Sequence, residues 1–176
     1  MSTVEEDVPI NEPGINIQEY SGKYLTFVLG EESFGVAVIK VREIIRMQEV
    51  TEVPQMPAHI KGVINLRGKI IPIVDLRIKF NLEMQELTNK ACIIVVQVLS
   101  KEGSASQMGI IVNAVEEVTN ISGEAIEEAP SFGNQLDQNY ILAIAKIKDK
   151  VKTLLDIDTI LEPEDLVGQS SAFMDF

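Results

Sequence analysis

Residues 61–80 are the part of this sequence that most constrains how the chain can fold. Within them, two apolar runs at residues 63–66 and 70–74 flank a polar tip, Arg-Gly-Lys at residues 67–69. A short tip that contains glycine between two β-branched runs is typical of a β-hairpin, because glycine adopts positive φ without steric cost. The sequence therefore predicts a strand, a tip and a second strand over residues 63–74.

Residues within and after the second run refine this prediction. Pro72 has no amide hydrogen to donate to a neighbouring strand, so the run is expected at an edge or a bulge of its sheet. Asp75 follows the run, where its carboxylate can cap a short helical turn. Leu76 and Phe80, four residues apart on that turn, would pack it against the hairpin.

The order of elements occurs twice along the chain. Residues 34–44 align with residues 108–118, and residues 67–76 align with residues 148–157. Four or five short, β-branched strands in each half suit closure into a barrel better than an open sheet. The predicted fold is therefore all-β, with two pseudo-symmetric SH3-like five-stranded barrels and short connecting helices.

The repeat also predicts how the chain is divided. We expect the first barrel at residues 21–85 and the second at residues 86–162, between a mobile N-terminal tail at residues 1–20 and a C-terminal tail at residues 163–176. Each half has about 70 residues, a size at which a separate core is marginal. The halves are therefore expected to share an apolar seam.

Three further segments carry local predictions. Val41, Ile44 and Ile45 are spaced as one face of a short helix. Residues 81–90 are polar without clear periodicity, which is typical of a linker. Residues 122–139 form a long loop with glycine and proline, and loops of this length inside a small domain are often functional.

Composition argues against binding to nucleic acid or to an anionic membrane. The chain of 176 residues has 27 acidic and 15 basic residues and a formal net charge of −12. Both kinds of binding need a basic face, and no cluster in the sequence supplies one. No apolar run is long enough to span a bilayer, and the N-terminus lacks the features of a signal peptide. We therefore expect a cytoplasmic protein without direct membrane insertion.

Catalytic and metal-binding residues are scarce. With His59 and Cys92 as the one histidine and the one cysteine, the chain cannot build a usual zinc site or a Cys–His pair. Neither a phosphate-binding glycine loop nor a Gly-x-Ser-x-Gly elbow is present. Cys92 lies in an apolar run, which favours a buried, unreactive thiol. The sequence predicts no enzyme, no metal site and no cofactor.

Four segments resemble the CheW-type chemotaxis coupling proteins, and the resemblance extends over residues 24–161. Residues 34–44 and the loop at residues 129–132 are two of these segments. The other two are the most specific to the family. The two specific segments are Ile60-Lys61-Gly62-Val63-Ile64-Asn65-Leu66-Arg67-Gly68 and Ile71-Pro72-Ile73-Val74-Asp75-Leu76.

This resemblance implies two SH3-like five-stranded barrels and a non-catalytic adaptor in bacterial chemotaxis. Family members join the cytoplasmic helical tips of transmembrane, methyl-accepting chemoreceptors to the regulatory domain of the histidine kinase CheA, in arrays at the membrane. The kinase itself and the CheV-type adaptors carry further domains that do not fit into 176 residues. A standalone coupler is therefore expected.

By resemblance, Val41, Glu43, Gly62 and Arg67 belong to the receptor-binding face. Arg67 can offer its planar guanidinium to carboxylate or carbonyl oxygens on a receptor helix. Val41 can receive the apolar stripe of such a helix, and Glu43 can pair with a basic residue. Structural alternatives stay open: a solvated charge for Arg67, a core position for Val41, an exposed charge for Glu43, and a helix cap or close packing for Gly62.

Phe132 resembles a family position that contacts the kinase. An aromatic side chain on a loop can anchor a partner, or it can plug the end of the second barrel. Glu127 stands where family members can carry a basic residue, so the charge pattern of that contact differs here.

Two other functions remain as alternatives. A small barrel that binds single-stranded nucleic acid would need a basic groove with stacking aromatic residues, whereas this chain is acidic and only 5% aromatic. A coupler in another chemosensory pathway, such as pilus-based motility, has the same sequence features.

Overall fold

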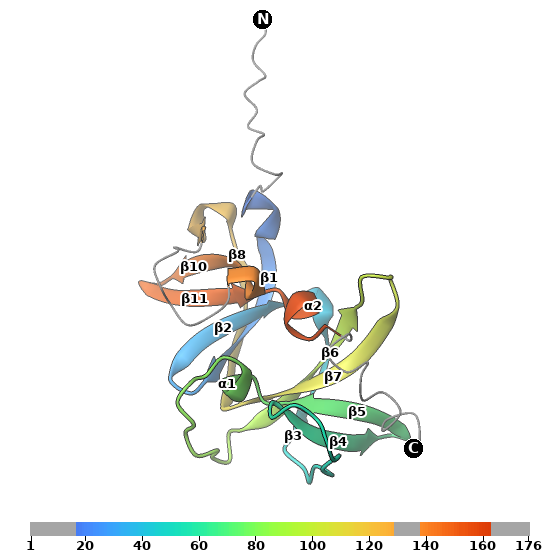
Figure 1. Cartoon of the computed structure of the whole chain (residues 1–176). Coiled ribbons are helices and arrows are strands. Elements are labelled where there is room, and N and C mark those ends of the chain that lie inside the picture. The colour runs from blue at the N-terminus through green and yellow to red at the C-terminus, as the bar shows by residue number, and fades with distance from the viewer. Residues whose placement is uncertain (1–16, 129–137, 163–176) are drawn as a thin grey trace, which may run out of the picture.

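The computed structural model describes residues 17–128 and 138–162, which fold into two β-sheets (Figure 1). The first sheet has the strand order β8-β1-β2-β11-β10-β9, and the second has the order β3-β6-β7-β5-β4. The strands are β1 (Gly22–Leu29), β2 (Glu32–Ala37), β3 (Val41–Arg46), β4 (Ile60–Leu66), β5 (Lys69–Val74), β6 (Cys92–Leu99), β7 (Ala105–Val112), β8 (Ala114–Ile121), β9 (Ile126–Glu127), β10 (Ile141–Ile147) and β11 (Lys150–Leu155). The short helices are α1 (Leu76–Lys79) and α2 (Ile157–Ile160), with 3-10 turns η2 (Ile17–Tyr20), η3 (Val38–Lys40), η4 (Gly123–Ala125) and η5 (Gln138–Tyr140).

The predicted fold class is confirmed, since strands dominate and the two sheets correspond to two SH3-like barrels. The strand count differs slightly from five and five, because the two-residue strand β9 adds a sixth strand to the first sheet. The pseudo-symmetry is visible in the parallel pairs at the centre of each sheet. Gly35 of β2 lies opposite Leu154 of β11, and the aligned Gly109 of β7 lies opposite Ile73 of β5.

Both of these glycines are needed for the same reason. A Cβ atom at Gly35 would lie 2.9 Å from a methyl group of Leu154, and one at Gly109 would lie 2.7 Å from a methyl group of Ile73. Each glycine thus leaves room for an aliphatic side chain at the strand crossing, and the repeat in the sequence corresponds to a repeat in packing.

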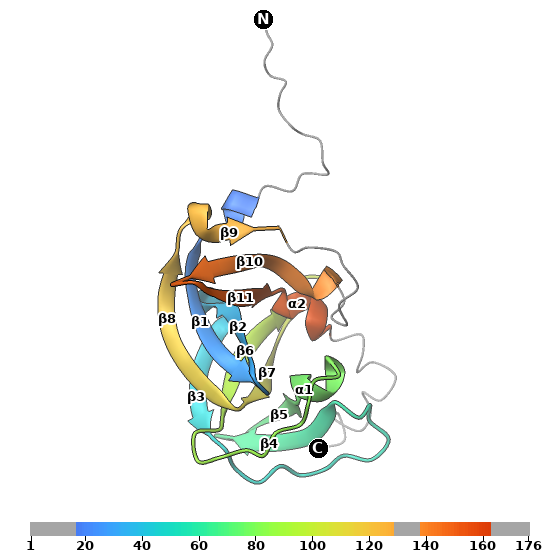
Figure 2. The same cartoon turned by 90° about the vertical axis from the view of Figure 1, so that its left-hand side faces the viewer.

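The predicted division into barrels at residues 21–85 and 86–162 is wrong, because each sheet draws strands from both ranges. The hairpin β1–β2 pairs with β8 on one side and with β11 on the other. Likewise, β3 pairs with β6, and β5 pairs with β7. Figure 2 shows the two halves of the chain interleaved in this way. The physical reason is that the outer edge strands of each short hairpin form their remaining hydrogen bonds with strands that are distant in the sequence. Residues 1–16 and 163–176 lie outside the described residues, and residues 17–20 form η2.

The predicted shared seam is confirmed as the largest core. It joins strands of both sheets and both short α-helices, and its fully buried members include Phe27, Phe34, Leu76, Ile110 and Leu155. Two smaller cores fill the individual sheets. The shared core therefore holds the halves together as one folding unit.

The hairpin of β4 and β5 has a tighter turn than predicted. Leu66 pairs with Lys69, so Lys69 belongs to β5 and only Arg67 and Gly68 form the turn. Their φ angles are +52° and +88°. Positive φ at both central residues is the requirement of a type I′ turn. The Asn65 side chain accepts a hydrogen bond of 2.8 Å from the Gly68 amide, which fixes this turn further.

Pro72 is predicted at an edge or a bulge, and the edge position is wrong, since β5 lies between β4 and β7. A bulge does lie close by, between Ile60 and Gly62 of β4, next to the pair of Val63 with Pro72. The pairing with β7 covers only Ile73 and Val74, which follow the proline. Pro72 therefore lies in the part of β5 that is paired on one side only, and its missing amide hydrogen costs no hydrogen bond there.

The predicted helix through Val41, Ile44 and Ile45 is also wrong. These residues belong to strand β3, in which partly buried and exposed positions alternate. The helical spacing arises because η3 and a bulge between Val41 and Glu43 shift the alternation at the start of the strand. Before β4, the Ile60 amide donates a 3.0 Å hydrogen bond to the Pro57 carbonyl and closes a turn, and Ile60 begins the strand.

The cap predicted at Asp75 is confirmed, and Asp156 at the aligned position of the repeat caps the second α-helix. The Asp75 carboxylate accepts a hydrogen bond from the Arg77 amide at α1, and the Asp156 carboxylate accepts one from the Thr159 amide at α2. The Asp75 and Asp156 amides also donate equivalent hydrogen bonds of 2.8 Å, to the carbonyls of His59 and Tyr140. None of the helices in the described part of the chain has the length and apolarity needed to cross a membrane.

Candidate functional site

Arg67 and Glu43 form an ion pair in which the Arg67 Nη2 atom donates to the Glu43 Oε2 atom. Arg67 lies in the β4–β5 turn, and Glu43 lies on β3 at the opposite edge of the same sheet. The pair therefore bridges β3 and the β4–β5 turn, which lie at the two ends of the strand order. The Arg67 side chain is 69% exposed, so most of its guanidinium remains open to solvent. An exposed pair of this kind contributes only about 0–1 kcal/mol to stability, and its main effect is to orient the arginine.

Gly62 lies on β4, where the backbone of the β3–β4 connection crosses it. The Thr51 and Val63 amides and carbonyls exchange two hydrogen bonds of 2.9 Å. Gly62 has a φ of +145°, and a Cβ atom there would lie 2.1 Å from the Thr51 carbonyl oxygen. Gly62 is therefore a close-packing position and not a helix cap.

Val41 begins β3 and packs, partly buried, against the shared core. It pairs with Val96 of β6, one bulge away from Glu43. Val41 thus packs on the shared core, whereas Glu43 pairs with Val95 of the core inside this sheet. The four residues predicted by resemblance belong to one sheet and its β4–β5 turn.

Two exposed aliphatic residues on these same elements were missed by sequence reasoning. Ile44 on β3 is 45% exposed, and Ile70 next to the β4–β5 turn is 38% exposed. Their aligned positions in the first sheet, Val118 and Val151, are exposed as well. An aliphatic residue at the same position of both repeats is the sequence signal that could have identified Ile44 and Ile70. A single exposed aliphatic residue is ordinary, whereas one that recurs at aligned positions is not.

In the first sheet, a different group of side chains joins β11, β8 and β2. The Lys152 Nζ atom donates 3.0 Å hydrogen bonds to the Ser33 hydroxyl and to the Glu116 carboxylate, and the Ser33 hydroxyl donates to the same carboxylate at 2.5 Å. Lys152 is buried, and so is Ile71 at the aligned position of the first hairpin. The lysine is tolerated because its charge is paired and hydrogen-bonded.

This arrangement lowers the pKa of Glu116. Burial alone would raise the pKa, but the hydrogen bonds from Ser33 and Lys152 and the positive charge of Lys152 outweigh that effect. Glu116 is therefore ionised in the folded protein at a lower pH than in the unfolded chain.

We expect Glu116→Gln to reduce the acid sensitivity of folding. Since the pKa of Glu116 is lower in the folded state, its stabilising contribution is present above the unfolded pKa, about 4.3, and is lost as the pH falls through the folded pKa. Urea unfolding between pH 3 and pH 7 should show a shallower rise of stability with pH for Glu116→Gln than for the wild type. Parallel curves for the two proteins would contradict this assignment.

The remaining candidate residues have limited roles in the described structure. Phe132 lies outside the described residues. Glu127 pairs with Lys146 at 3.1 Å on the exposed face of β9 and β10. Burial raises the pKa of the Cys92 thiol, which keeps it protonated and unreactive. No group of three or more histidine, cysteine or acidic residues is placed to hold a metal ion within residues 17–128 and 138–162.

Comparisons with known proteins agree with this geometry. The CheW-like domain model matches residues 23–165. The chemotaxis protein CheW of Klebsiella aerogenes is 33% identical over 144 residues, which cover 82% of this chain and 84% of that protein. CheW of Bacillus subtilis is 32% identical, with 81% of this chain and 88% of that protein covered.

A solved structure shows the same fold. The scaffolding protein TtCheW from Thermoanaerobacter tengcongensis superposes with a TM-score of 0.70 and 34% sequence identity, covering 77% of this chain and 89% of that one. The family match over most of the chain and the similar structure lead to one conclusion. This chain belongs to the CheW-like domain family of chemotaxis scaffold proteins.

Proposed function

We propose that this protein is a non-catalytic adaptor that couples transmembrane chemoreceptors to a CheA-type histidine kinase in bacterial chemotaxis. It works in the cytoplasm, at receptor arrays on the membrane. The supporting observation is the exposed Arg67–Glu43 pair, on the sheet that also carries Val41, Gly62 and the exposed aliphatic residues Ile44 and Ile70. A cytoplasmic receptor helix carries both an apolar stripe and charged residues, and this surface offers matching chemistry.

Each proposed residue has its own part in receptor binding. Arg67 donates to carboxylate or carbonyl oxygens on the helix, and Glu43 holds the guanidinium in place until the helix arrives. Ile44 and Ile70 provide apolar contact. Val41 and Gly62 act indirectly, by fixing the shape of the sheet. Val41 packs on the shared core, and Gly62 leaves room for the backbone of Thr51, which passes close to it.

The kinase would bind elsewhere on the same molecule, so that receptor and kinase are held together. Phe132 is proposed as one kinase contact on the basis of the family resemblance. Contacts of this kind are individually modest, and many linked copies in an array supply the avidity.

We expect Arg67→Glu to weaken binding to a receptor cytoplasmic fragment by about tenfold or more, because it removes the guanidinium donor and places two carboxylates side by side. Kinase binding and the unfolding midpoint should stay close to those of the wild type, since the side chain is exposed. Affinities for the receptor fragment and for the kinase would be measured in parallel.

Lys23→Glu is the matched control, since Lys23 is an exposed basic residue on β1, in the other sheet. It makes the same charge change away from the turn and should bind the receptor fragment nearly as the wild type does. Equal receptor binding by the wild type and a folded Arg67→Glu protein would exclude Arg67 from the receptor face. A wild-type protein that binds neither partner would refute the adaptor function itself.

A further inference from the structure

The chain passes from one sheet to the other at two places within residues 17–128 and 138–162. Strands β1, β2 and β8 to β11 belong to the first sheet, and β3 to β7 belong to the second. The crossings are therefore β2 to β3, through η3, and β7 to β8, through Asn113 alone. Residue 39 of η3 aligns with residue 113 in the internal repeat. The pseudo-symmetry thus relates the two crossings to each other.

The crossing at Asn113 is short, neutral and fully hydrogen-bonded. The Asn113 amide donates a 2.9 Å hydrogen bond to the Val28 carbonyl, and the Asn113 side-chain oxygen accepts a 2.8 Å hydrogen bond from the Gly30 amide. Val28 also pairs with Ala114 of β8, so the ladder between β1 and β8 continues into this crossing. Asn113 is therefore a fixed point between the two sheets.

The crossing at η3 is held in a different way. The ladder between β3 and β6 ends where Val41 pairs with Val96, and it does not continue into η3. A single carboxylate makes the connection instead. Asp158 Oδ2 accepts a 2.6 Å hydrogen bond from Lys40 Nζ at the end of η3, and Asp158 Oδ1 accepts a 2.9 Å hydrogen bond from the Leu99 amide at the end of β6. We call this group of three residues the Asp158 clamp.

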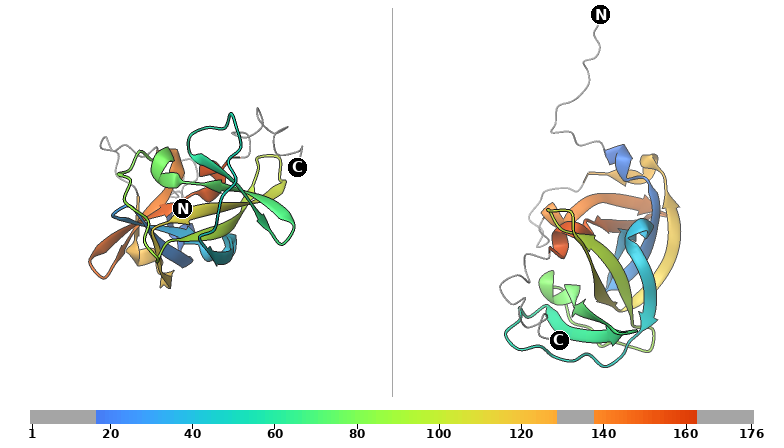
Figure 3. Two further views of the ribbon diagram at one scale, coloured as in Figure 1. Left: turned by 90° about the horizontal axis from the view of Figure 1, so that it is seen from below. Right: turned by 90° about the vertical axis from the view of Figure 1, so that its right-hand side faces the viewer.

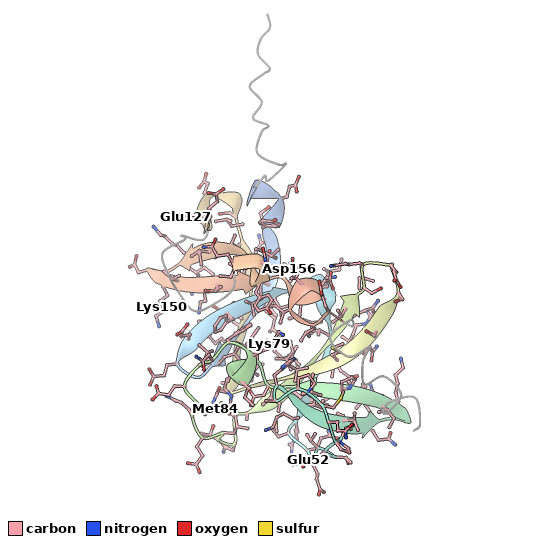
Figure 4. All side chains as sticks on the ribbon, in the orientation of Figure 1. Glu52, Lys79, Met84, Glu127, Lys150 and Asp156 are labelled. Atoms are coloured by element: carbon pink, nitrogen blue, oxygen red, sulfur yellow. The ribbon has the colours of Figure 1, made fainter. Side chains whose placement is uncertain are left out.

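The Asp158 clamp joins elements that belong to different sheets. Asp158 lies on α2, which follows β11 of the first sheet, whereas Leu99 belongs to the second sheet. Figures 1 and 3 show α2 beside the β6–β7 hairpin, and Asp156, which caps α2, marks this place between the sheets in Figure 4. Ile157 and Ile160 anchor α2 in the shared core on either side of Asp158. The carboxylate is therefore held firmly on the side of the first sheet.

The ion pair with Lys40 is the part of the clamp that can be released. The side chains of Lys40 and Asp158 are 25% and 31% exposed, so water and dissolved ions reach them. The hydrogen bonds at Asn113 carry no net charge and do not depend on an ion pair. One crossing is thus fixed, and the equivalent crossing depends on an accessible ion pair.

The releasable crossing leads directly into the proposed receptor face. Lys40 immediately precedes Val41, the first residue of β3, and Glu43 follows two residues later. Glu43 accepts the hydrogen bond that orients the exposed Arg67 side chain. Since η3 sets where β3 begins, a shift of η3 would move Glu43 relative to Arg67.

We propose that Asp158 is a positioning residue for the receptor face. Its carboxylate ties η3 and the end of β6 to α2, so that the two sheets keep one relative orientation and β3 presents Glu43 to Arg67. When the ion pair with Lys40 is broken, the second sheet turns about Asn113 while the shared apolar core stays packed, as in shear motions between packed elements. The link to receptor binding rests on the proposed adaptor function, whereas the clamp itself can be measured without a partner.

The test uses the full chain, with a receptor cytoplasmic fragment as the probe. Asp158→Asn keeps an oxygen that can accept from the Leu99 amide but removes the charge that holds Lys40. We expect residual dipolar couplings of the backbone amides, fitted separately for the two sheets, to show a changed relative orientation. Receptor affinity should fall by about fivefold or more. The unfolding midpoint should stay close to that of the wild type, since the lost ion pair is partly exposed.

Three further variants separate the clamp from general effects of substitution. Lys40→Gln should give the same two changes as Asp158→Asn, and the double variant should give no more than either single one, because both act through one ion pair. Lys40→Arg keeps the charge and should keep the wild-type orientation and affinity. Lys146→Gln is the matched control, since it breaks the ion pair with Glu127 inside the first sheet and should change neither quantity.

The two readouts separate failure of the clamp from failure of the adaptor function. An unchanged orientation in Asp158→Asn and Lys40→Gln would overturn the clamp, whatever happens to receptor affinity. A changed orientation with wild-type receptor affinity would overturn the positioning role. A wild-type protein that does not bind the receptor fragment would overturn the adaptor function and the positioning role together, and the dipolar couplings would then decide the clamp alone.

Discussion

Arg77→Ala is expected to lower the free energy of unfolding by about 3–5 kcal/mol. Arg77 and Asp75 are only 4% and 2% exposed, and the guanidinium binds both carboxylate oxygens, at 3.0 Å from Nε and 2.9 Å from Nη2. The Nη1 atom also donates a 2.7 Å hydrogen bond to the Gln85 carbonyl. Removal of the arginine leaves a buried carboxylate without its counter-charge and a carbonyl without its donor. Urea unfolding at neutral pH would measure the loss.

The same change should also loosen the connection between α1 and β6. The Arg77 Nη1 atom donates to the Gln85 carbonyl, so the Arg77 side chain fixes a segment that the sequence alone presents as a linker. Amide hydrogen exchange should therefore become faster around residues 82–85. Arg46→Ala removes an exposed arginine and should change stability by no more than about 0.5 kcal/mol. A loss below 1 kcal/mol for Arg77→Ala would show that the pair is not a major source of stability.

Gly62→Ala is expected to cost about 2–4 kcal/mol of stability and to displace the β3–β4 connection. The added Cβ atom would lie 2.1 Å from the Thr51 carbonyl oxygen, which belongs to the backbone and cannot move alone. The two hydrogen bonds between Thr51 and Val63 should therefore break. Loss of protection of the Thr51 and Val63 amides from hydrogen exchange would report this directly.

Gly22→Ala is the matched control for this experiment. Gly22 has the same φ of +145°, but a Cβ atom there meets nothing within 4 Å. Its substitution measures the backbone strain alone, and the difference between the two variants measures the steric conflict with Thr51. Weaker receptor binding by Gly62→Ala with intact Thr51–Val63 hydrogen bonds would show direct contact, and would contradict the close-packing assignment.

Much of the receptor face could be predicted from the sequence, because its signals are local or resemble a family motif. The Arg67-Gly68 turn follows from a glycine between two β-branched runs, and the Asp75 cap follows from an acceptor placed directly after a strand. That these residues contact the receptor stays a prediction. The ion pair of Arg67 with Glu43 joins residues 24 positions apart, and no pattern in the sequence selects that partner.

The sequence by itself determined most of the strands, the position of the β4–β5 hairpin, the Asp75 cap and the internal repeat, since backbone preference and side-chain alternation act between near neighbours. Only the tertiary structure decided which strands share a sheet, as in the parallel pairs of β2 with β11 and of β5 with β7. It also decided the burial of Arg77, the crossing of Thr51 over Gly62, and the pairing of Lys152 with Ser33, 119 positions away. These features depend on closing long loops against a shared apolar core, and that closure leaves no signal in the residues that flank each position.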